Sequence, residues 1–148
     1  MSSPANPRPR RSLADVWLFI QAFFWLAGMQ AAIAFFRFQT LARWLGLEPG
    51  QTANFPAPEQ STVTQKVAWA VAAGARRTPW VSTCLAQALA GAALLKARKI
   101  PGQVTLGVAK DPASKGGYAA HAWLTSGGNI LTGAAGHERY QVIAVFKL

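Results

Sequence analysis

The chain carries no charge over the 21 residues from Val16 to Phe36. An α-helix of that length spans about 30 Å, which is the thickness of the hydrocarbon core of a bilayer. The segment is therefore predicted to be a helix that spans or lies in a membrane, or one that packs on the rest of the protein and on a partner. A secretory signal is the third interpretation, although Ala32-Ile33-Ala34 is only a faint match to its cleavage site. The predicted location is the cytoplasm, with membrane association through residues 16–36 in the membrane interpretation.

The charge balance is strongly basic, with 15 Lys and Arg against 5 Asp and Glu and a formal net charge of +10. The arginines that flank the apolar segments suit anionic lipid headgroups or an acidic stretch of peptide; they are Arg8, Arg10, Arg11, Arg37 and Arg43. The basic residues form no recognisable nucleic-acid motif, so no nucleic-acid partner is predicted. Few carboxylates remain for a paired-carboxylate hydrolase, and the single cysteine excludes an internal disulfide and a multi-cysteine zinc site. We expect neither a metal site nor a cofactor.

Composition divides the chain into four parts: a flexible basic arm, apolar and amphipathic helices, a linker with prolines, and an α+β domain. They cover residues 1–12, 13–47, 48–60 and 61–148 in that order. In the last part, two helices are predicted over Val63–Arg76, capped by Ser61 or Thr62, and Cys84–Lys99, capped by Ser82 or Thr83. Strands are predicted over 104–109, 118–126, 129–132 and 140–147, with a Gly127-Gly128 hairpin turn. The predicted fold class is α+β, with helices and an antiparallel sheet.

The only cysteine, Cys84, falls in the first turn of a predicted helix, directly after the Ser/Thr cap. The helix dipole and unpaired N–H groups at that position favour a thiolate. The backbone N–H groups of Cys84 and Leu85 would also suit an oxyanion during acyl transfer. The alternative is a structural role, since free cysteines are often small buried apolar residues.

The middle of a predicted strand carries His121, within the sequence Tyr118-Ala-Ala-His-Ala-Trp123. A cysteine at a helix N-terminus that faces a histidine on a following antiparallel strand is the arrangement of papain-like and transglutaminase-like enzymes. This pattern makes Cys84 a candidate nucleophile and His121 a candidate general base. The alternative for His121 is a half-buried sheet residue, and His137 is expected to be solvated in a loop.

The order of motifs resembles that of the lasso-peptide biosynthesis B proteins, the stand-alone microcin-processing leader peptidases with a transglutaminase-like fold. The resemblance runs from about Val63 to the end of the chain. It rests on Pro79-Trp80-Val-Ser-Thr-Cys84-Leu-Ala-Gln-Ala-Leu, Leu94-Leu95-Lys-Ala-Arg-Lys-Ile-Pro101, Leu106-Gly107-Val108, Ala120-His121-Ala122-Trp123 and Gly128-Asn-Ile-Leu-Thr-Gly133.

The resemblance implies a cysteine protease that removes the leader from a lasso precursor peptide, with Cys84 as nucleophile and His121 as general base. It also implies three partners: the precursor leader, a small protein that recognises the leader, and a separate cyclase that forms the macrolactam. A catalytically weak or inactive peptide-binding protein of the same fold at the membrane is the alternative.

The third catalytic residue of that family, an aspartate, has no counterpart here, because the aligned position is Gly133 and residues 129–136 contain no carboxylate. With a two-residue turn, Trp123 is predicted to oppose Thr132, which would place Thr132 diagonal to His121 on one face of the sheet. Thr132 is therefore the candidate orienting residue. The predicted site is a Cys–His dyad or an incomplete triad.

Overall fold

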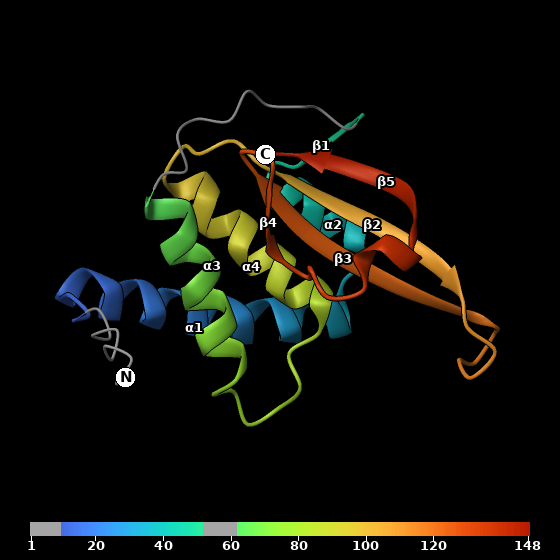
Figure 1. Cartoon of the computed structure of the whole chain (residues 1–148), viewed down its shortest axis with the longest axis horizontal. Coiled ribbons are helices and arrows are strands. Elements are labelled where there is room, and N and C mark those ends of the chain that lie inside the picture. The colour runs from blue at the N-terminus through green and yellow to red at the C-terminus, as the bar shows by residue number, and fades with distance from the viewer. Residues whose placement is uncertain (1–9, 52–61) are drawn as a thin grey trace, which may run out of the picture.

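The computed structural model describes residues 10–51 and 62–148, which form α-helices packed on one antiparallel sheet (Figure 1). The described α-helices are α1 (Leu13–Phe35), α2 (Phe38–Trp44), α3 (Thr62–Ala75) and α4 (Cys84–Ala97). The described strands are β1 (Glu48–Gly50), β2 (Gln103–Lys110), β3 (Tyr118–Ser126), β4 (Asn129–Thr132) and β5 (Gln141–Lys147), with a 3₁₀ helix, η1 (His137–Arg139), before β5. This arrangement confirms the predicted α+β class.

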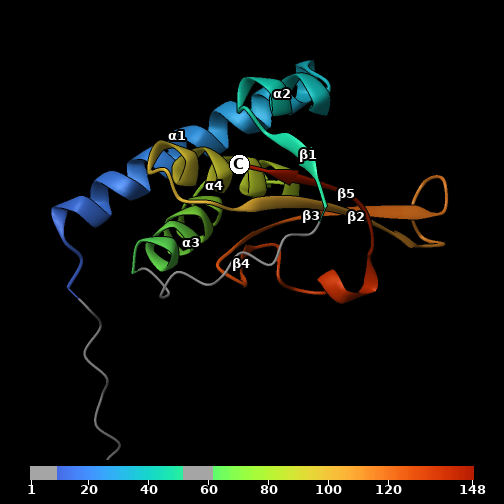
Figure 2. The same cartoon turned by 90° about the horizontal axis from the view of Figure 1, so that it is seen from above.

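The sheet has the strand order β1-β5-β2-β3-β4, and every neighbouring pair is antiparallel. Seen from above, α1, α2 and α4 lie on one side of the sheet and η1 lies on the other (Figure 2). The β3–β4 hairpin turns at Gly127 and Gly128, both of which have positive φ (58° and 78°). Positive φ at both central residues is what a type I′ two-residue hairpin turn requires, so the predicted turn is confirmed.

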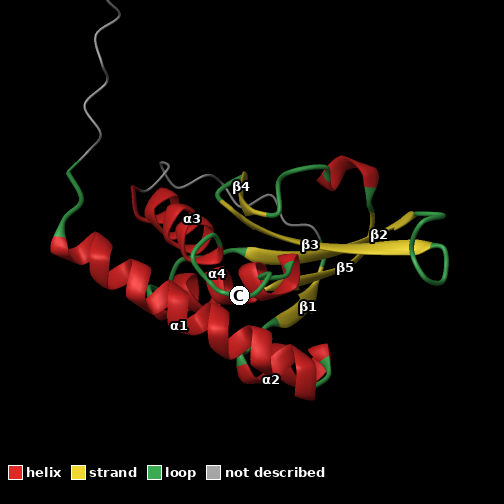
Figure 3. Cartoon of the chain, turned by 90° about the horizontal axis from the view of Figure 1, so that it is seen from below, coloured by secondary structure: helices red, strands yellow, loops and turns green. Residues whose placement is uncertain are grey.

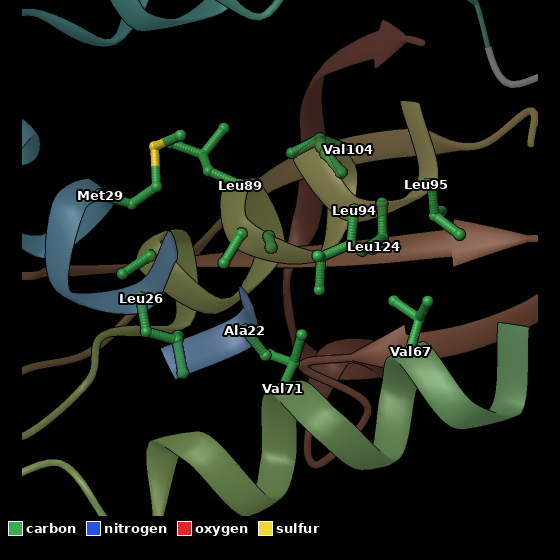
Figure 4. Close-up of a cluster of buried hydrophobic side chains, with 14 of the residues drawn as sticks. Ala22, Leu26, Met29, Val67, Val71, Leu89, Leu94, Leu95, Val104 and Leu124 are labelled. Carbon is green, nitrogen blue, oxygen red and sulfur yellow. The ribbon is translucent and has the colours of Figure 1, made fainter. Parts of the chain in front are cut away.

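One hydrophobic core lies between the helices and the sheet (Figure 4). Leu26 of α1, Val71 of α3 and Leu89 of α4 are fully buried in it. The sheet contributes Val104, Ala122 and Leu124 from the face that α4 covers. The N-terminal helices therefore share a core with the strands, so the segments before and after the predicted linker belong to the same core.

The longest described helix, α1, runs along α3 and α4 (Figure 3). Its two faces differ in burial. Its inner face is packed into the protein and consists of Asp15, Leu18, Ala22, Leu26 and Met29. Its outer face leaves large apolar side chains in solvent, including Trp17 (60% exposed) and Phe24 (70% exposed). By length and composition α1 qualifies as a membrane-crossing helix, with a mean hydropathy of 1.7.

The predicted helices and strands are found with small shifts at their ends, and one strand is present that was not predicted. Residues 48–50 were predicted to belong to the linker, but they form β1, which pairs with the last strand, β5. A strand of three residues that contains Pro49 and Gly50 has no alternation to reveal it, and it is fixed only by its partner. Residues 1–9 of the predicted arm, residues 52–60 of the predicted linker and the candidate cap Ser61 lie outside the described residues.

Acid sensitivity is expected at the start of α1, where Asp15 forms a 2.8 Å ion pair with Lys66 of α3. Lys66 and the capping bonds of Ser12 lower the pKa of Asp15 from 3.8 to about 2. A carboxylate whose pKa is lower in the folded state contributes stability above pH 3.8, and that contribution is lost as the pH falls toward 2. We expect Lys66→Met to raise the Asp15 pKa, as measured by NMR titration of its side-chain carboxyl carbon. An unchanged Asp15 pKa in this variant would show that the ion pair with Lys66 is not what lowers it.

Candidate functional site

The N-terminus of α4 is formed by Thr83 and Cys84. Thr83 is the N-cap, with extended φ and ψ (−66° and 157°), and its side chain accepts a 3.2 Å hydrogen bond from Ala86 N. Of the two predicted caps it is therefore Thr83 that caps the helix, since the Ser82 hydroxyl pairs with that of Thr78 instead. Cys84 is the first residue of α4 and is partly buried against the core.

Two backbone donors at this helix end are available to a ligand. Within the described part of the chain, neither Cys84 N nor Leu85 N donates a hydrogen bond, because the first-turn bonds begin at Ala86 and Gln87. Such free N–H groups at the positive end of a helix favour a nearby anion, including a thiolate or a developing oxyanion. The structure thus presents a thiol and two free donors on consecutive residues.

His121 projects from β3 toward the side of the sheet that carries η1. Its neighbours Ala122 and Leu124 face the helical core, and side chains alternate along a strand. The imidazole stacks on Tyr140, with ring centroids 4.9 Å apart. Its Nε2 lies 2.7 Å from the carbonyl oxygen of Gly133, so Nε2 carries the proton and Nδ1 is the basic nitrogen of the neutral ring.

The two candidate catalytic side chains therefore lie on different faces of the sheet. Cys84 packs against the core on the α4 side, whereas His121 lies on the η1 side. No hydrogen bond joins Cys84 to His121 among the described residues. The sequence correctly predicts that Cys84 begins a helix and that His121 lies in a strand. In this conformation, however, the thiol and the imidazole do not form a hydrogen bond.

The predicted position of Thr132 was wrong. A bulge in the β3–β4 ladder makes Leu124, rather than Trp123, the partner of Thr132. One additional residue in a strand moves the side chains beyond it to the other face. Thr132 consequently lies on the helical side, where it is buried and its Oγ1 has no hydrogen-bond partner among the described atoms. The group that contacts the imidazole is instead the backbone carbonyl of Gly133.

Aromatic residues around His121 form a cluster that the sequence did not reveal. The indole of Trp123 lies between the two histidines of the chain, with centroids 5.9 Å from His121 and 5.7 Å from His137. His137 Nδ1 donates to the carbonyl oxygen of Ala134 at 2.7 Å, and the ring lies beside Glu138. The alternation of β3 could have indicated that Trp123 and His121 share a face, but the return of η1 over that face has no local signal.

The carboxylates near this face do not reach His121. Asp111 accepts hydrogen bonds from Ser114 and Ala113, and these bonds lower its pKa, the Ser114 bond most of all. Glu138 contacts His137 at 3.5 Å. Over residues 10–51 and 62–148, no three His, Cys, Asp or Glu side chains gather in a way that could hold a metal ion.

Comparison with known proteins gives a family for the chain. The profile of the transglutaminase-like superfamily matches residues 25–145, which include all of α3, α4 and β2 to β4 and about the C-terminal half of α1. No curated protein and no solved structure matches the sequence. This superfamily includes cysteine proteases and transglutaminases, and the matched range contains both Cys84 and His121. The chain belongs to the transglutaminase-like superfamily.

Proposed function

We propose that this protein is a cysteine peptidase that cleaves the leader from a lasso precursor peptide. The observation that carries the proposal is the N-terminus of α4, where Cys84 follows the Thr83 cap and has two free backbone donors beside it. The transglutaminase-like family supports the reaction type. The order of motifs, which resembles the lasso-peptide B proteins, supports the substrate.

The reaction would proceed through an acyl-enzyme. His121 accepts the proton of the Cys84 thiol, the resulting thiolate attacks the scissile carbonyl carbon, and the N–H groups of Cys84 and Leu85 stabilise the oxyanion. The C–N bond then breaks, and a proton from the imidazolium of His121 goes to the leaving amine. Water hydrolyses the thioester and regenerates the thiol. Because His121 lies on the far face, the peptide must bind with a rearrangement of β3 that brings the imidazole to Sγ.

The proposed partners follow from this reaction. The leader of the precursor is the substrate, a small recognition protein delivers it, and a cyclase takes the freed core amine to form a macrolactam. The described residues of this chain form one core with no separate leader-binding unit, so delivery by another protein suits the proposal.

The direct test combines the full chain, a synthetic lasso precursor peptide and the recognition protein that binds its leader. Mass spectrometry of the products should show one cut at the leader–core junction, without added metal. Complete absence of cleavage by the wild-type protein would overturn the proposal.

A second candidate is a peptide-binding protein without catalysis. The observation that favours it is the separation of Cys84 and His121 on two faces of the sheet, with a carbonyl rather than a carboxylate beside the imidazole. Such a protein would bind the precursor peptide but leave it intact. Binding measured by fluorescence anisotropy with no product in the mass spectrum would support this candidate over the peptidase.

We also propose that α1 associates with an anionic membrane through its outer face. Exposed Trp17 and Phe24 lie on that face, and the net charge of the chain is +10. Tryptophans suit the interface between lipid and water, and basic residues nearby strengthen binding to anionic lipid. Because the inner face of α1 is packed on α3 and α4, the helix would lie on the membrane rather than span it.

Vesicle sedimentation tests this membrane contact. The double variant Trp17→Ser, Phe24→Ser should bind vesicles of phosphatidylcholine with phosphatidylglycerol at least about tenfold more weakly, since two large apolar side chains no longer enter the interface. Ile143→Ser is the matched control, because Ile143 is equally exposed (62%) but lies on β5. Equal binding by the wild type and the double variant would remove α1 as the contact surface.

A further inference from the structure

The helix α1 contacts the turn before α4 at two points, although the two are far apart in the sequence. Phe23 of α1 packs against Trp80, with ring centroids 6.3 Å apart. About two helical turns further along α1, the side-chain oxygen of Gln30 accepts hydrogen bonds from Thr83 N (3.1 Å) and Thr83 Oγ1 (3.3 Å). The turn that precedes Cys84 is therefore held by α1 as well as by its own hydrogen bonds.

The contact with Gln30 fixes the orientation of the cap. A threonine hydroxyl has one proton to donate and lone pairs with which to accept. Here its proton is directed to Gln30 Oε1, so its lone pair is free to accept from Ala86 N. Gln30 also binds the N–H of Thr83, the residue directly before Cys84. A single amide oxygen thus accepts hydrogen bonds from both the backbone N–H and the hydroxyl of the N-cap residue.

We propose that Gln30 is a positioning residue for the Cys84 nucleophile. This inference rests on the proposed peptidase function, which it deepens. With Gln30 in place, Thr83 keeps the first turn of α4 formed, and the free N–H groups of Cys84 and Leu85 stay directed at the thiolate and the oxyanion. The N-terminal apolar helix therefore belongs to the catalytic unit in addition to contributing to the core.

The chain supplies a matched control for this role at the other end of α4. Gln21 of α1 accepts a 2.8 Å hydrogen bond from Arg98 Nη2, just beyond the C-terminus of α4. Gln21→Met and Gln30→Met each remove one glutamine oxygen that links α1 to α4, with a side chain of similar length. Only Gln30 forms its contact at the N-terminus of α4, which carries Cys84. Comparison of the two variants therefore distinguishes an effect on the position of Cys84 from a general loss of stability.

Steady-state cleavage of the precursor peptide, with its recognition protein present, gives the first readout. Gln30→Met should lower kcat about tenfold and leave KM within about twofold, because misorientation of the first turn weakens the transition state rather than peptide binding. Gln21→Met should leave kcat within about twofold of the wild type. Equal kcat in the two variants would overturn the proposal.

Alkylation of the thiol by iodoacetamide gives a second readout that needs no substrate. The chain has a single cysteine, so the rate of adduct formation by mass spectrometry reports Cys84 alone. Gln30→Met should react several-fold more slowly than Gln21→Met, because the N–H groups are no longer held toward the thiolate. If the wild type cleaves no precursor, the peptidase proposal fails, and this rate still decides the role of Gln30. Equal alkylation rates would then overturn the positioning role.

Discussion

The Cys84→Ala variant is expected to lose leader cleavage by at least about a thousandfold, because no other thiol exists in the chain to form the acyl-enzyme. The first turn of α4 should survive the change, since Thr83 provides the cap and Cys84 is only partly buried. The measurement is the initial rate of product formation from the precursor peptide, with the recognition protein present. Thermal unfolding, followed by circular dichroism, should show nearly unchanged stability.

Two further variants sharpen this result. Cys84→Ser keeps the size of the side chain but replaces the thiolate with a far less acidic hydroxyl, so it should be as inactive as the alanine variant. Ser82→Ala is the matched control, because the Ser82 hydroxyl is paired with Thr78 and lies before the cap. That variant should retain cleavage within a few-fold. Cleavage by Cys84→Ala at the wild-type rate would show that the thiol is not the nucleophile.

The elements that carry the site could be predicted because their signals are local. A cap residue followed by an apolar helix marks the start of α4, and Thr83 with Cys84 occupies those two positions. Gly127-Gly128 between two alternating stretches marks the β3–β4 hairpin, and both glycines adopt positive φ as that turn requires. Each signal lies within a few residues, where backbone preferences alone decide the structure.

The face of the sheet on which each site residue lies could not be predicted, because it depends on contacts between distant segments. One additional residue in β4 moved Thr132 to the helical side, and no sequence pattern announces such a bulge. The face of His121 depends on which side of β3 the helices cover, a choice made by the packing of α4 against Ala122 and Leu124. The uncharged residues 16–35 of α1 were equally ambiguous, since their sequence does not reveal which side of the helix packs against α3.

Gly133 is the point where the family aspartate and the backbone of this chain conflict. Its φ is +74°, a left-handed conformation that costs an L-residue about 1–2 kcal/mol. A Cβ at this position would lie 2.5 Å from the carbonyl oxygen of Ala122 and 2.9 Å from Trp123 Cβ. Both contacts are far below normal separations, and the first involves backbone that a rotamer change cannot move. The carbonyl of Gly133 also accepts the hydrogen bond from His121.

Gly133→Asp is therefore expected to lower the free energy of unfolding by about 3 kcal/mol or more, rather than to complete a triad. The shift needed to relieve the Ala122 contact would also displace the carbonyl that holds His121, so leader cleavage should fall as well. Urea unfolding measures the first effect, with Gly128→Asp as the matched control, because Gly128 also has positive φ (78°) but nothing within 4 Å of its Cβ position. That control should lose only about 1–2 kcal/mol, the cost of the left-handed conformation itself. A Gly133→Asp protein as stable as the Gly128→Asp control would mean that the segment after β4 can move away from Ala122, and that a carboxylate can be placed beside His121 without loss of the fold.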